Sequence, residues 1–220
     1  MDGFDLTDAQ RAQLHEFVGM VRSSPHNLVS PRAREELWTR HVPECLALAR
    51  LLVHRPGPLL DVGSGGGFPG IVLAIAQPDR ETHLLDATAK KCRFLKNVSD
   101  ELGLGVTVHT ARAEEVSRGT LAGRFATVTA RAVAPLERLV PLSAPFLADD
   151  GVLVALKGER WRPELDRASG QLRSLRLMAL ATPNTLEVAA VEGQALRVVM
   201  IGRRGTPLLL QAPPPAAPTT

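Results

Sequence analysis

A glycine-rich segment at residues 61–67, Asp-Val-Gly-Ser-Gly-Gly-Gly, constrains the fold of this chain more than any other feature. An apolar stretch typical of a strand, Leu59–Val62, leads into it, and a helix is predicted after it at Pro69–Ala76. Glycines permit a tight turn and let a ligand approach the backbone where a Cβ atom would obstruct it. Ligands of open α/β sheets bind beyond the carboxyl ends of the strands. The segment therefore predicts a strand–turn–helix unit that binds a nucleotide-like cofactor.

Strands and helices alternate from Pro58 onward. The sequence predicts seven strands, at Leu59–Val62, His83–Asp86, Val106–Thr110, Phe125–Ala130, Gly151–Leu156, Leu175–Ala181 and Leu196–Ile201. Such alternation is typical of parallel sheets with right-handed crossovers, and the last two strands fit an antiparallel edge. The predicted fold is therefore α/β and Rossmann-like, with a mainly parallel seven-stranded sheet flanked by helices.

The beginning of the chain carries helical signals and no strand signal. A helix-start pattern lies at Thr7, and Pro43 is expected to bend or interrupt a later helix. The end of the chain is rich in proline and alanine, a composition typical of disorder. We therefore predict an N-terminal helical extension at 1–55, a cofactor-binding domain at 56–204 and a disordered tail at 205–220.

Composition and charge exclude several classes of protein. The net charge of +3 permits an RNA partner without requiring one. Tyrosine is absent and aromatic residues make up 4%, which argues against a platform that stacks several bases. Cys45 and Cys92 lack metal-ligand spacing, so we expect reduced thiols and no metal site. The sequence shows neither a signal peptide nor the ~20 apolar residues of a membrane span, and we predict a cytoplasmic monomer without membrane contact.

The spacing within the glycine loop distinguishes between two cofactors. A dinucleotide requires Gly-x-Gly-x-x-Gly, with the helix N-terminus facing a pyrophosphate. Here three consecutive glycines, Gly65–Gly67, are followed by Phe68 and Pro69. S-adenosylmethionine has no phosphate; its ammonium and sulfonium suit the carboxylate of Asp61, and its carboxylate suits backbone N–H groups. The prediction is S-adenosylmethionine, with a NAD-binding oxidoreductase as the alternative.

Polar residues follow the second, third and fourth predicted strands. Asp86 can accept hydrogen bonds from both ribose hydroxyls of a nucleoside, or it can cap a helix. Glu114, with Ala113, stands where an adenine would lie, or it stabilises a helix start. Arg131 suits a phosphate or a purine edge, and its alternative role is a surface salt bridge.

Basic residues lie near the same predicted rim. Lys157 closes the fifth strand, and Lys90, Lys91, Arg93 and Lys96 form a basic run on one helix. Such a run is usually a solvated helix face, but beside a cofactor site it suits an RNA backbone. RNA contact is therefore a hypothesis for Lys90, Lys91 and Lys157.

Several segments occur together in the order typical of one known family. They are Asn27-Leu28, Arg40-His41-Val42, Leu60–Gly70, Asp86–Lys91, Phe94-Leu95, Ala113–Glu115, Arg131–Leu136 and Leu156–Gly158. On these segments the chain resembles the RsmG (GidB) family of bacterial 16S ribosomal RNA methyltransferases. The Gly-Phe-Pro-Gly continuation of the loop at 67–70 is the most specific of them, because other methyltransferases lack it.

The resemblance implies a class I methyltransferase that forms 7-methylguanosine in 16S rRNA, with the small ribosomal subunit or its precursor as partner. Together with the loop itself, it gives the predicted cofactor contacts: Asp61, Gly63, Gly65, Gly67, Phe68, Asp86, Ala87, Thr88, Ala113, Glu114 and Arg131. It also implies RNA contact by His41, Lys90 and Lys91. The chain departs from the family pattern in two places, where Glu44-Cys45 replaces Asp-Ser and where a basic C-terminal segment diverges after Pro207.

The implied reaction needs no general base. Ring nitrogen 7 of guanine carries a lone pair in the ring plane and gains a methyl group without losing a proton. The enzyme then contributes alignment at about 3–3.5 Å and stabilisation of the charge that develops on the purine. Arg131 is the predicted catalytic residue, acting by positioning a phosphate or the cofactor carboxylate. The alternatives are a methyltransferase for another RNA, a protein or a small molecule, and a ribosome-assembly factor without enzymatic activity.

Overall fold

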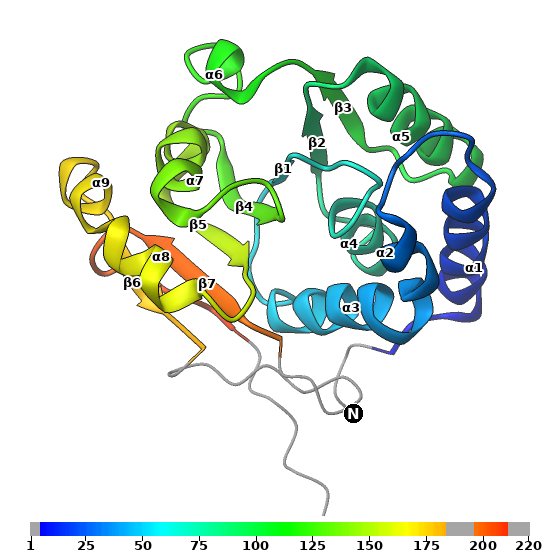
Figure 1. Cartoon of the computed structure of the whole chain (residues 1–220), viewed down its shortest axis with the longest axis horizontal. Helices are drawn as coiled ribbons and strands as arrows, with labels where there is room; N and C mark the ends of the chain where they lie inside the picture. The colour runs from blue at the N-terminus through cyan, green and yellow to red at the C-terminus, as the bar shows by residue number, and fades with distance from the viewer. Residues whose placement is uncertain (1–4, 184–195, 211–220) are drawn as a thin grey trace, which may run out of the picture.

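The computed structural model describes residues 5–183 and 196–210, and in this part a seven-stranded sheet carries helices on both faces (Figure 1). The strands are β1 (Leu59–Val62), β2 (Thr82–Asp86), β3 (Thr107–Thr110), β4 (Phe125–Arg131), β5 (Leu147–Leu156), β6 (Met178–Ala181) and β7 (Val198–Gly202). Their order is β3-β2-β1-β4-β5-β7-β6; β1 to β5 are parallel, and β7 is antiparallel to β5 and β6. The predicted fold class is confirmed, including the antiparallel pairing near one edge.

The helices follow the predicted alternation. They are α1 (Asp8–Ser23), α2 (Pro31–Glu35), a π-helical turn (Leu37–His41), α3 (Val42–Leu51), α4 (Gly70–Ala76), α5 (Ala89–Leu102), α6 (Ala113–Val116), α7 (Leu136–Ser143), a 3-10 turn (Ala144–Phe146), α8 (Trp161–Arg167) and α9 (Ser169–Ser174). One predicted helix near Glu164–Leu172 is two short ones, α8 and α9. The helix start at Thr7 is confirmed, because the Thr7 hydroxyl accepts the Gln10 N–H and the Gln10 side chain accepts the Thr7 N–H.

Pro43 interrupts the helical extension as predicted, through a local widening of the helix. Proline has no N–H group, so Pro43 cannot donate to the carbonyl of Thr39 in the preceding turn. The backbone adopts a π-helical turn over Leu37–His41, and α3 begins directly after it at Val42. The change of helical geometry therefore falls between His41, the last residue of the π-helical turn, and Glu44 in the first turn of α3, two residues that line the candidate site.

The three central strands end in one row. Val62, the last residue of β1, is in register with Leu85 of β2 and Ala130 of β4. The next residue on each neighbouring strand, Asp86 and Arg131, therefore lies at the same carboxyl edge. The connection after β1 leads to β2 on one side, and the connection after β4 leads to β5 on the other, so the carboxyl ends of β1 and β4 form the switch point at which open α/β sheets bind ligands.

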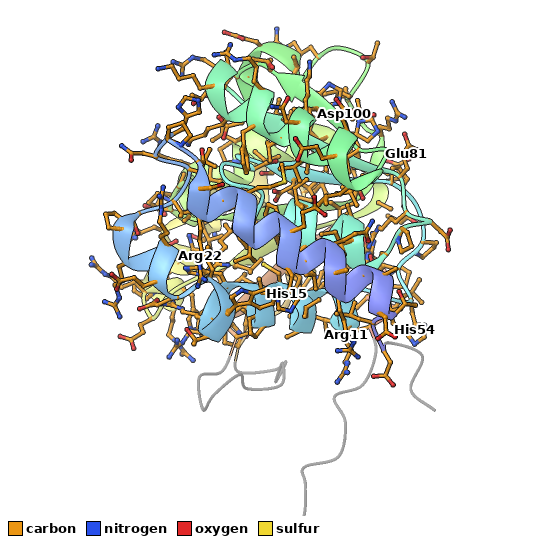
Figure 2. All side chains as sticks on the ribbon, turned by 90° about the vertical axis from the view of Figure 1, so that its right-hand side faces the viewer. Arg11, His15, Arg22, His54, Glu81 and Asp100 are labelled. Carbon is orange, nitrogen blue, oxygen red and sulfur yellow. The ribbon has the colours of Figure 1, made fainter. Side chains whose placement is uncertain are left out.

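Through α1, the extension packs onto α4 and α5, two helices beside the sheet. Apolar residues of α1 recur at helical spacing and are buried against α4, α5 and β2; they are Leu14, Phe17, Val18 and Val21. Figure 2 faces α1 and shows it lying across this side of the molecule, with Arg11, His15 and Arg22 along its length. Those three residues are exposed. The extension is thus part of the hydrophobic core and not an appended arm.

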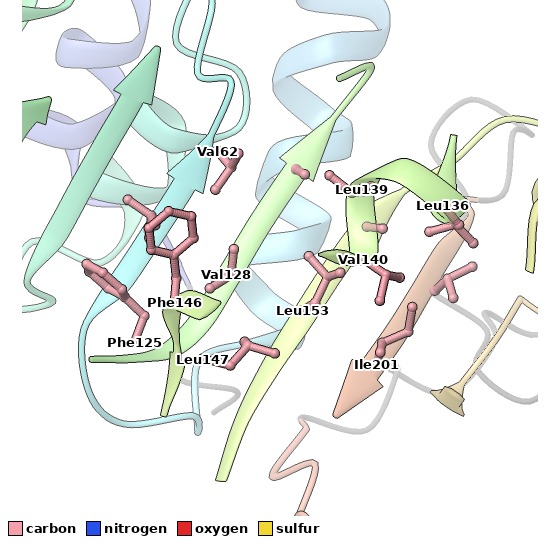
Figure 3. Packing of buried hydrophobic residues seen from close by; sticks show 14 of the residues in the cluster. Val62, Phe125, Val128, Leu136, Leu139, Val140, Phe146, Leu147, Leu153 and Ile201 are labelled. Atoms are coloured by element: carbon pink, nitrogen blue, oxygen red, sulfur yellow. The ribbon is translucent and has the colours of Figure 1, made fainter. Parts of the chain in front are cut away.

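The other face of the sheet is covered by α7 and the turn that follows it. Leu136, Leu139 and Val140 of α7 pack onto residues of β1, β4, β5 and β7, among them Val62 and Val128 (Figure 3). Strands buried on both faces explain the nearly continuous apolar runs in the sequence. The two layers fix the position of the loops at the carboxyl edge.

The predicted tail begins at residue 205, and the structure describes it as far as residue 210; residues 211–220 lie outside the described part. The buried guanidinium of Arg55 donates to the carbonyls of Pro207 at 2.7 Å and Leu208 at 3.3 Å. Leu208 and Leu210 pack against a buried cluster that includes Leu48 and Leu59. Residues 207–210 therefore contact the domain.

Within the described residues, no helix combines the length and apolar character needed to cross a membrane.

Candidate functional site

A cavity of about 570 Å³ opens at the carboxyl edge where β1, β2 and β4 end. Its lining comes from both the extension and the domain, and includes Leu28, Val29, Ser30, Ala33, Arg40, His41, Glu44, Gly63, Ser64, Gly65, Gly66, Phe68, Lys91, Arg131, Ala132, Leu156, Lys157, Gly158, Glu164, Leu196 and Arg197. The volume lies within the range of small-molecule sites, about 300–1,000 Å³. The lining thus unites four predicted cofactor residues, Gly63, Gly65, Phe68 and Arg131, with three predicted RNA-contact residues, His41, Lys91 and Lys157. The predicted cofactor residues Asp86, Ala87, Thr88 and Ala113 are not part of it.

The glycine loop forms the floor of this cavity. Gly63 has a φ of +70°, and a Cβ atom there would lie 2.6 Å from Val133 Cγ2, so any side chain would both strain the turn and collide. Gly67 has a φ of +95° and packs against Phe17 and Ile71, where a Cβ atom would meet side-chain carbons at 3.0 and 2.8 Å. Gly63 and Gly65 line the cavity, whereas Gly67 is required for packing of the extension.

Asp86 joins the glycine loop to the end of β2. One carboxylate oxygen accepts the Gly65 N–H at 3.0 Å, and the other accepts the Thr88 N–H at 2.8 Å. Asp86 is 8% exposed, while Ala87 and Thr88 are exposed. The carboxylate therefore holds the loop in shape, and its partner Gly65 lines the cavity.

Asp61 lies beneath the loop and is not part of the cavity lining. Its carboxylate accepts the Gly70 N–H at 3.2 Å and the Thr129 hydroxyl at 2.7 Å, and the residue is 1% exposed. Burial raises its pKa to about 7, although these hydrogen bonds act in the opposite direction. Asp61 thus ties β1, β4 and the start of α4 together below the proposed ligand.

Arg131 is held by residues of the extension. Its guanidinium donates to Glu44 Oε2 at 2.7 Å, to His41 Nδ1, and weakly to Cys45 Sγ at 3.8 Å. Glu44 also accepts Arg40 Nε at 3.0 Å. Burial opposes ionisation of Glu44, but its contacts with His41, Arg131 and Arg40 outweigh burial and hold its pKa below the usual value.

Glu44 and Cys45 are site residues that sequence reasoning missed, because they appeared only as departures from a family pattern. The one available signal is their spacing: residues 41, 44 and 45 lie on one face of a helix, as the i, i+3 and i+4 positions do. Nothing local connects them to Arg131, which lies 87 residues from Glu44.

Lys157 is anchored within the protein. Its ammonium donates to Glu164 Oε2 at 2.6 Å and to the Ala134 carbonyl at 3.0 Å, and its side chain is 9% exposed. Glu164 Oε2 in turn accepts the Leu136 N–H at 3.1 Å. Lys157 therefore holds the loop after β4 at the cavity wall. Because its ammonium is mostly buried and already paired within the protein, it is poorly accessible to an RNA phosphate.

The remaining predicted residues lie at different distances from the cavity. Lys91 lines it, and Lys90 is exposed at the start of α5. Phe68 lines it and packs against Phe17, with ring centroids 4.9 Å apart. Glu114 is exposed on α6 and is not among the lining residues.

A second cavity of about 610 Å³ lies at the opposite edge, next to the residues that precede β1 and β2. It is lined by Arg55, Gly57 and Arg80 among others, and burial together with the charge of Arg55 lowers the Arg80 pKa to about 10. It contains no part of the glycine loop. No group of three or more potential metal ligands occurs among the described residues.

Comparisons with known proteins agree on one family. The family model GidB, described as rRNA small subunit methyltransferase G, matches residues 10–190. A ribosomal RNA small subunit methyltransferase G from Sorangium cellulosum is 40% identical over 189 residues, which are 82% of this chain and 79% of that protein. The protein of the same name from Beutenbergia cavernae is 40% identical over 198 residues, 86% of this chain and 90% of its own length.

Solved structures share the fold at low sequence identity. An O-methyltransferase from Bacillus cereus in complex with SAH superposes with a TM-score of 0.58 at 14% identity, covering 91% of this chain and 93% of that chain. This likeness concerns the architecture alone.

Proposed function

Because this chain belongs to the GidB family, described as rRNA small subunit methyltransferase G, we propose that it transfers a methyl group from S-adenosylmethionine to ring nitrogen 7 of a guanine in small-subunit ribosomal RNA. Membership of the family confirms the resemblance found in the sequence. The family also agrees with the predicted class of enzyme, a methyltransferase that uses S-adenosylmethionine.

The observation that carries the proposal is the meeting of the glycine loop, Asp86 and Arg131 at one edge of the sheet. Gly65 lines the cavity with a φ of +55°, and a Cβ atom built there would meet only the Gly63 carbonyl oxygen, at 3.7 Å, which fits the close approach of a ligand to the loop. The N–H groups of Gly63, Ser64, Gly65 and Gly67 donate to acceptors within the protein, so we assign the cofactor carboxylate to the Gly66 N–H and the ribose to Asp86. We assign the adenine to Glu114 and Ala113, since α6 follows β3 at the same edge of the sheet.

The residues of the cavity support alignment and not proton transfer. When bound, S-adenosylmethionine supplies a methyl group activated by a sulfonium, and guanine nitrogen 7 accepts it with its in-plane lone pair. No residue has to remove a proton from the base. The work left to the protein is to orient the base and to exclude water, which the packed walls formed by the extension and the loop after β4 favour.

An RNA partner is supported by the charge around the cavity. Arg40, Lys91 and Arg197 line it, and Lys90 is exposed beside it on α5. Basic side chains at a mouth of this kind attract a phosphate backbone. We infer that the partner is the small ribosomal subunit or its precursor, and that the protein acts on it as a monomer in the cytoplasm.

Methylation of ribosomal particles tests the proposal. Purified protein and methyl-labelled S-adenosylmethionine are incubated with small-subunit particles that lack the modification, with naked 16S rRNA, or with large-subunit particles as control. Nucleoside analysis should show 7-methylguanosine in small-subunit RNA only. Label on protein or on another base would refute the substrate. In a thermal-shift comparison S-adenosylhomocysteine should stabilise the protein and NAD should not.

A further inference from the structure

A chain of alternating charges runs from the surface of the extension to the cavity. Arg32 pairs with Glu36 at 2.7 Å, Glu36 with Arg40 at 3.3 Å, Arg40 with Glu44 at 3.0 Å, and Glu44 with Arg131 at 2.7 Å. The exposed fraction of the side chain is 81% for Arg32, 26% for Glu36, 44% for Arg40 and 15% for both Glu44 and Arg131. The network therefore ends in a largely buried ion pair on the cavity wall.

Glu44 divides its two oxygens between two arginines. Oε1 accepts a hydrogen bond from Arg40, and Oε2 accepts one from Arg131. The two arginines therefore do not compete for the same carboxylate oxygen. Arg131 also contacts His41 Nδ1, and the other ring nitrogen, His41 Nε2, is buried without a hydrogen-bond partner among the described residues. The Glu44–Arg131 pair carries no net charge, and Arg40, on the other oxygen of Glu44, is also paired with Glu36.

Neutrality at this wall matters for the proposed reaction, on which the present inference rests. As the carbon–sulfur bond breaks and the bond to nitrogen 7 forms, positive charge passes from the sulfonium to the purine. An unpaired guanidinium on the cavity wall would repel the positive charge that develops on the purine. A guanidinium paired with a carboxylate keeps its position on the wall without adding a net positive charge there.

We propose that Glu44 is a positioning residue of the methyl-transfer site: it holds the Arg131 guanidinium on the cavity wall and neutralises it. Because that charge is already matched inside the protein, Arg131 shapes the pocket for the base and is not a free receptor for an anion. The extension, through Glu44 and His41, therefore completes the catalytic cavity.

The test separates the charge of Glu44 from its shape. Glu44→Gln keeps the shape and removes the charge, and Glu44→Asp keeps the charge on a shorter side chain. Glu36→Gln is the matched control, because it removes a carboxylate from the same network without touching Arg131. Each variant is compared with the native protein in single-turnover methylation of small-subunit particles, in calorimetric binding of S-adenosylhomocysteine, and by NMR of the Arg131 Nε–H signal, assigned with Arg131→Lys.

Glu44→Gln should slow single-turnover methylation on the order of 10- to 100-fold, the range expected when a group at the reacting centre is misplaced. Binding of S-adenosylhomocysteine should stay within about threefold, since the glycine loop and Asp86 are unchanged, and the Arg131 signal should shift and lose its restricted rotation. Glu44→Asp should recover most of the rate, and Glu36→Gln should match the native protein in all three measurements.

A native rate or an unshifted Arg131 signal in Glu44→Gln would overturn the inference, as would an equal loss in Glu36→Gln. Absence of methylation by the native protein would instead refute the proposed function. In that case the NMR measurement still decides whether Glu44 holds Arg131.

Discussion

Replacing Asp61 by asparagine should make the cofactor-free protein more stable than the native chain at alkaline pH. Asp61 is 1% exposed, and burial raises its pKa from the ordinary 3.8 to about 7. The folded protein therefore binds the carboxyl proton more tightly than the unfolded chain does. Its contribution to stability is fully present below 3.8 and is lost as the pH rises towards 7.

The size of this effect follows from the shift. Each pKa unit corresponds to about 1.36 kcal/mol, so ionising Asp61 in the folded protein costs about 4 kcal/mol at most. The stabilising contribution of Asp61 begins to fall near its pKa in the unfolded chain, so about 2.5 kcal/mol of this free energy is lost between about pH 5 and pH 8. Asparagine keeps both contacts: its oxygen can accept the Gly70 N–H, and its amide can donate to the Thr129 hydroxyl oxygen. The substitution thus removes the titration and leaves the hydrogen bonds.

Urea unfolding of the native and Asp61→Asn proteins at several pH values, without cofactor, measures the difference in their free energies of unfolding. That difference should move in favour of the variant by about 2.5 kcal/mol from about pH 5 to pH 8. All other titratable groups are common to both proteins, so their contributions cancel in the difference. A difference that stays constant with pH would show that burial does not perturb Asp61, and would refute the reasoning.

Three further substitutions test other parts of the site. Gly63→Ala should cost about 1–3 kcal/mol of stability and weaken binding of S-adenosylhomocysteine, because its Cβ atom would strain the turn and meet Val133; thermal unfolding and calorimetry measure both. Lys157→Met should lower the free energy of unfolding by about 3–5 kcal/mol, since it leaves the Glu164 carboxylate buried without its cation; a loss under 1 kcal/mol in urea would contradict this. Glu114→Gln should weaken S-adenosylhomocysteine about fivefold at unchanged melting temperature, and unaltered affinity would remove Glu114 from the adenine site.

The sheet and the glycine loop could be predicted because their signals are local. The period of apolar residues and the place of glycine within a strand–turn–helix unit depend on a few neighbours in sequence. The register that aligns Val62, Leu85 and Ala130 then follows from parallel pairing. What sequence periodicity missed were boundaries, such as the start of β5 at Leu147 where Gly151 was predicted. Residues 148–150 carry no apolar alternation that would reveal them.

The contacts that define the site depend on long-range packing and could not be predicted. Asp61 was expected to face a cationic ligand, but a hydroxyl 68 residues away and the start of α4 occupy its oxygens. Lys157 was a candidate for RNA contact, but Glu164 brings a carboxylate to its ammonium. The sequence indicates that a charged residue at a strand end needs a partner of opposite charge or a hydrogen-bonding group. Only the folded structure determines whether that partner is a ligand or another part of the protein.

The hydrogen bonds of Arg55 have a consequence for the order in which the chain can finish folding. Arg55 follows α3, yet carbonyl acceptors of its buried guanidinium lie at Ala126, Asp150, Pro207 and Leu208, up to 153 residues later. A buried donor without an acceptor is costly. Synthesis proceeds from the amino terminus. The Arg55 guanidinium therefore stays hydrated until β7 and the segment at 207–208 have been made. Arg55 is made early in synthesis, yet it is among the last residues to gain all of its hydrogen bonds.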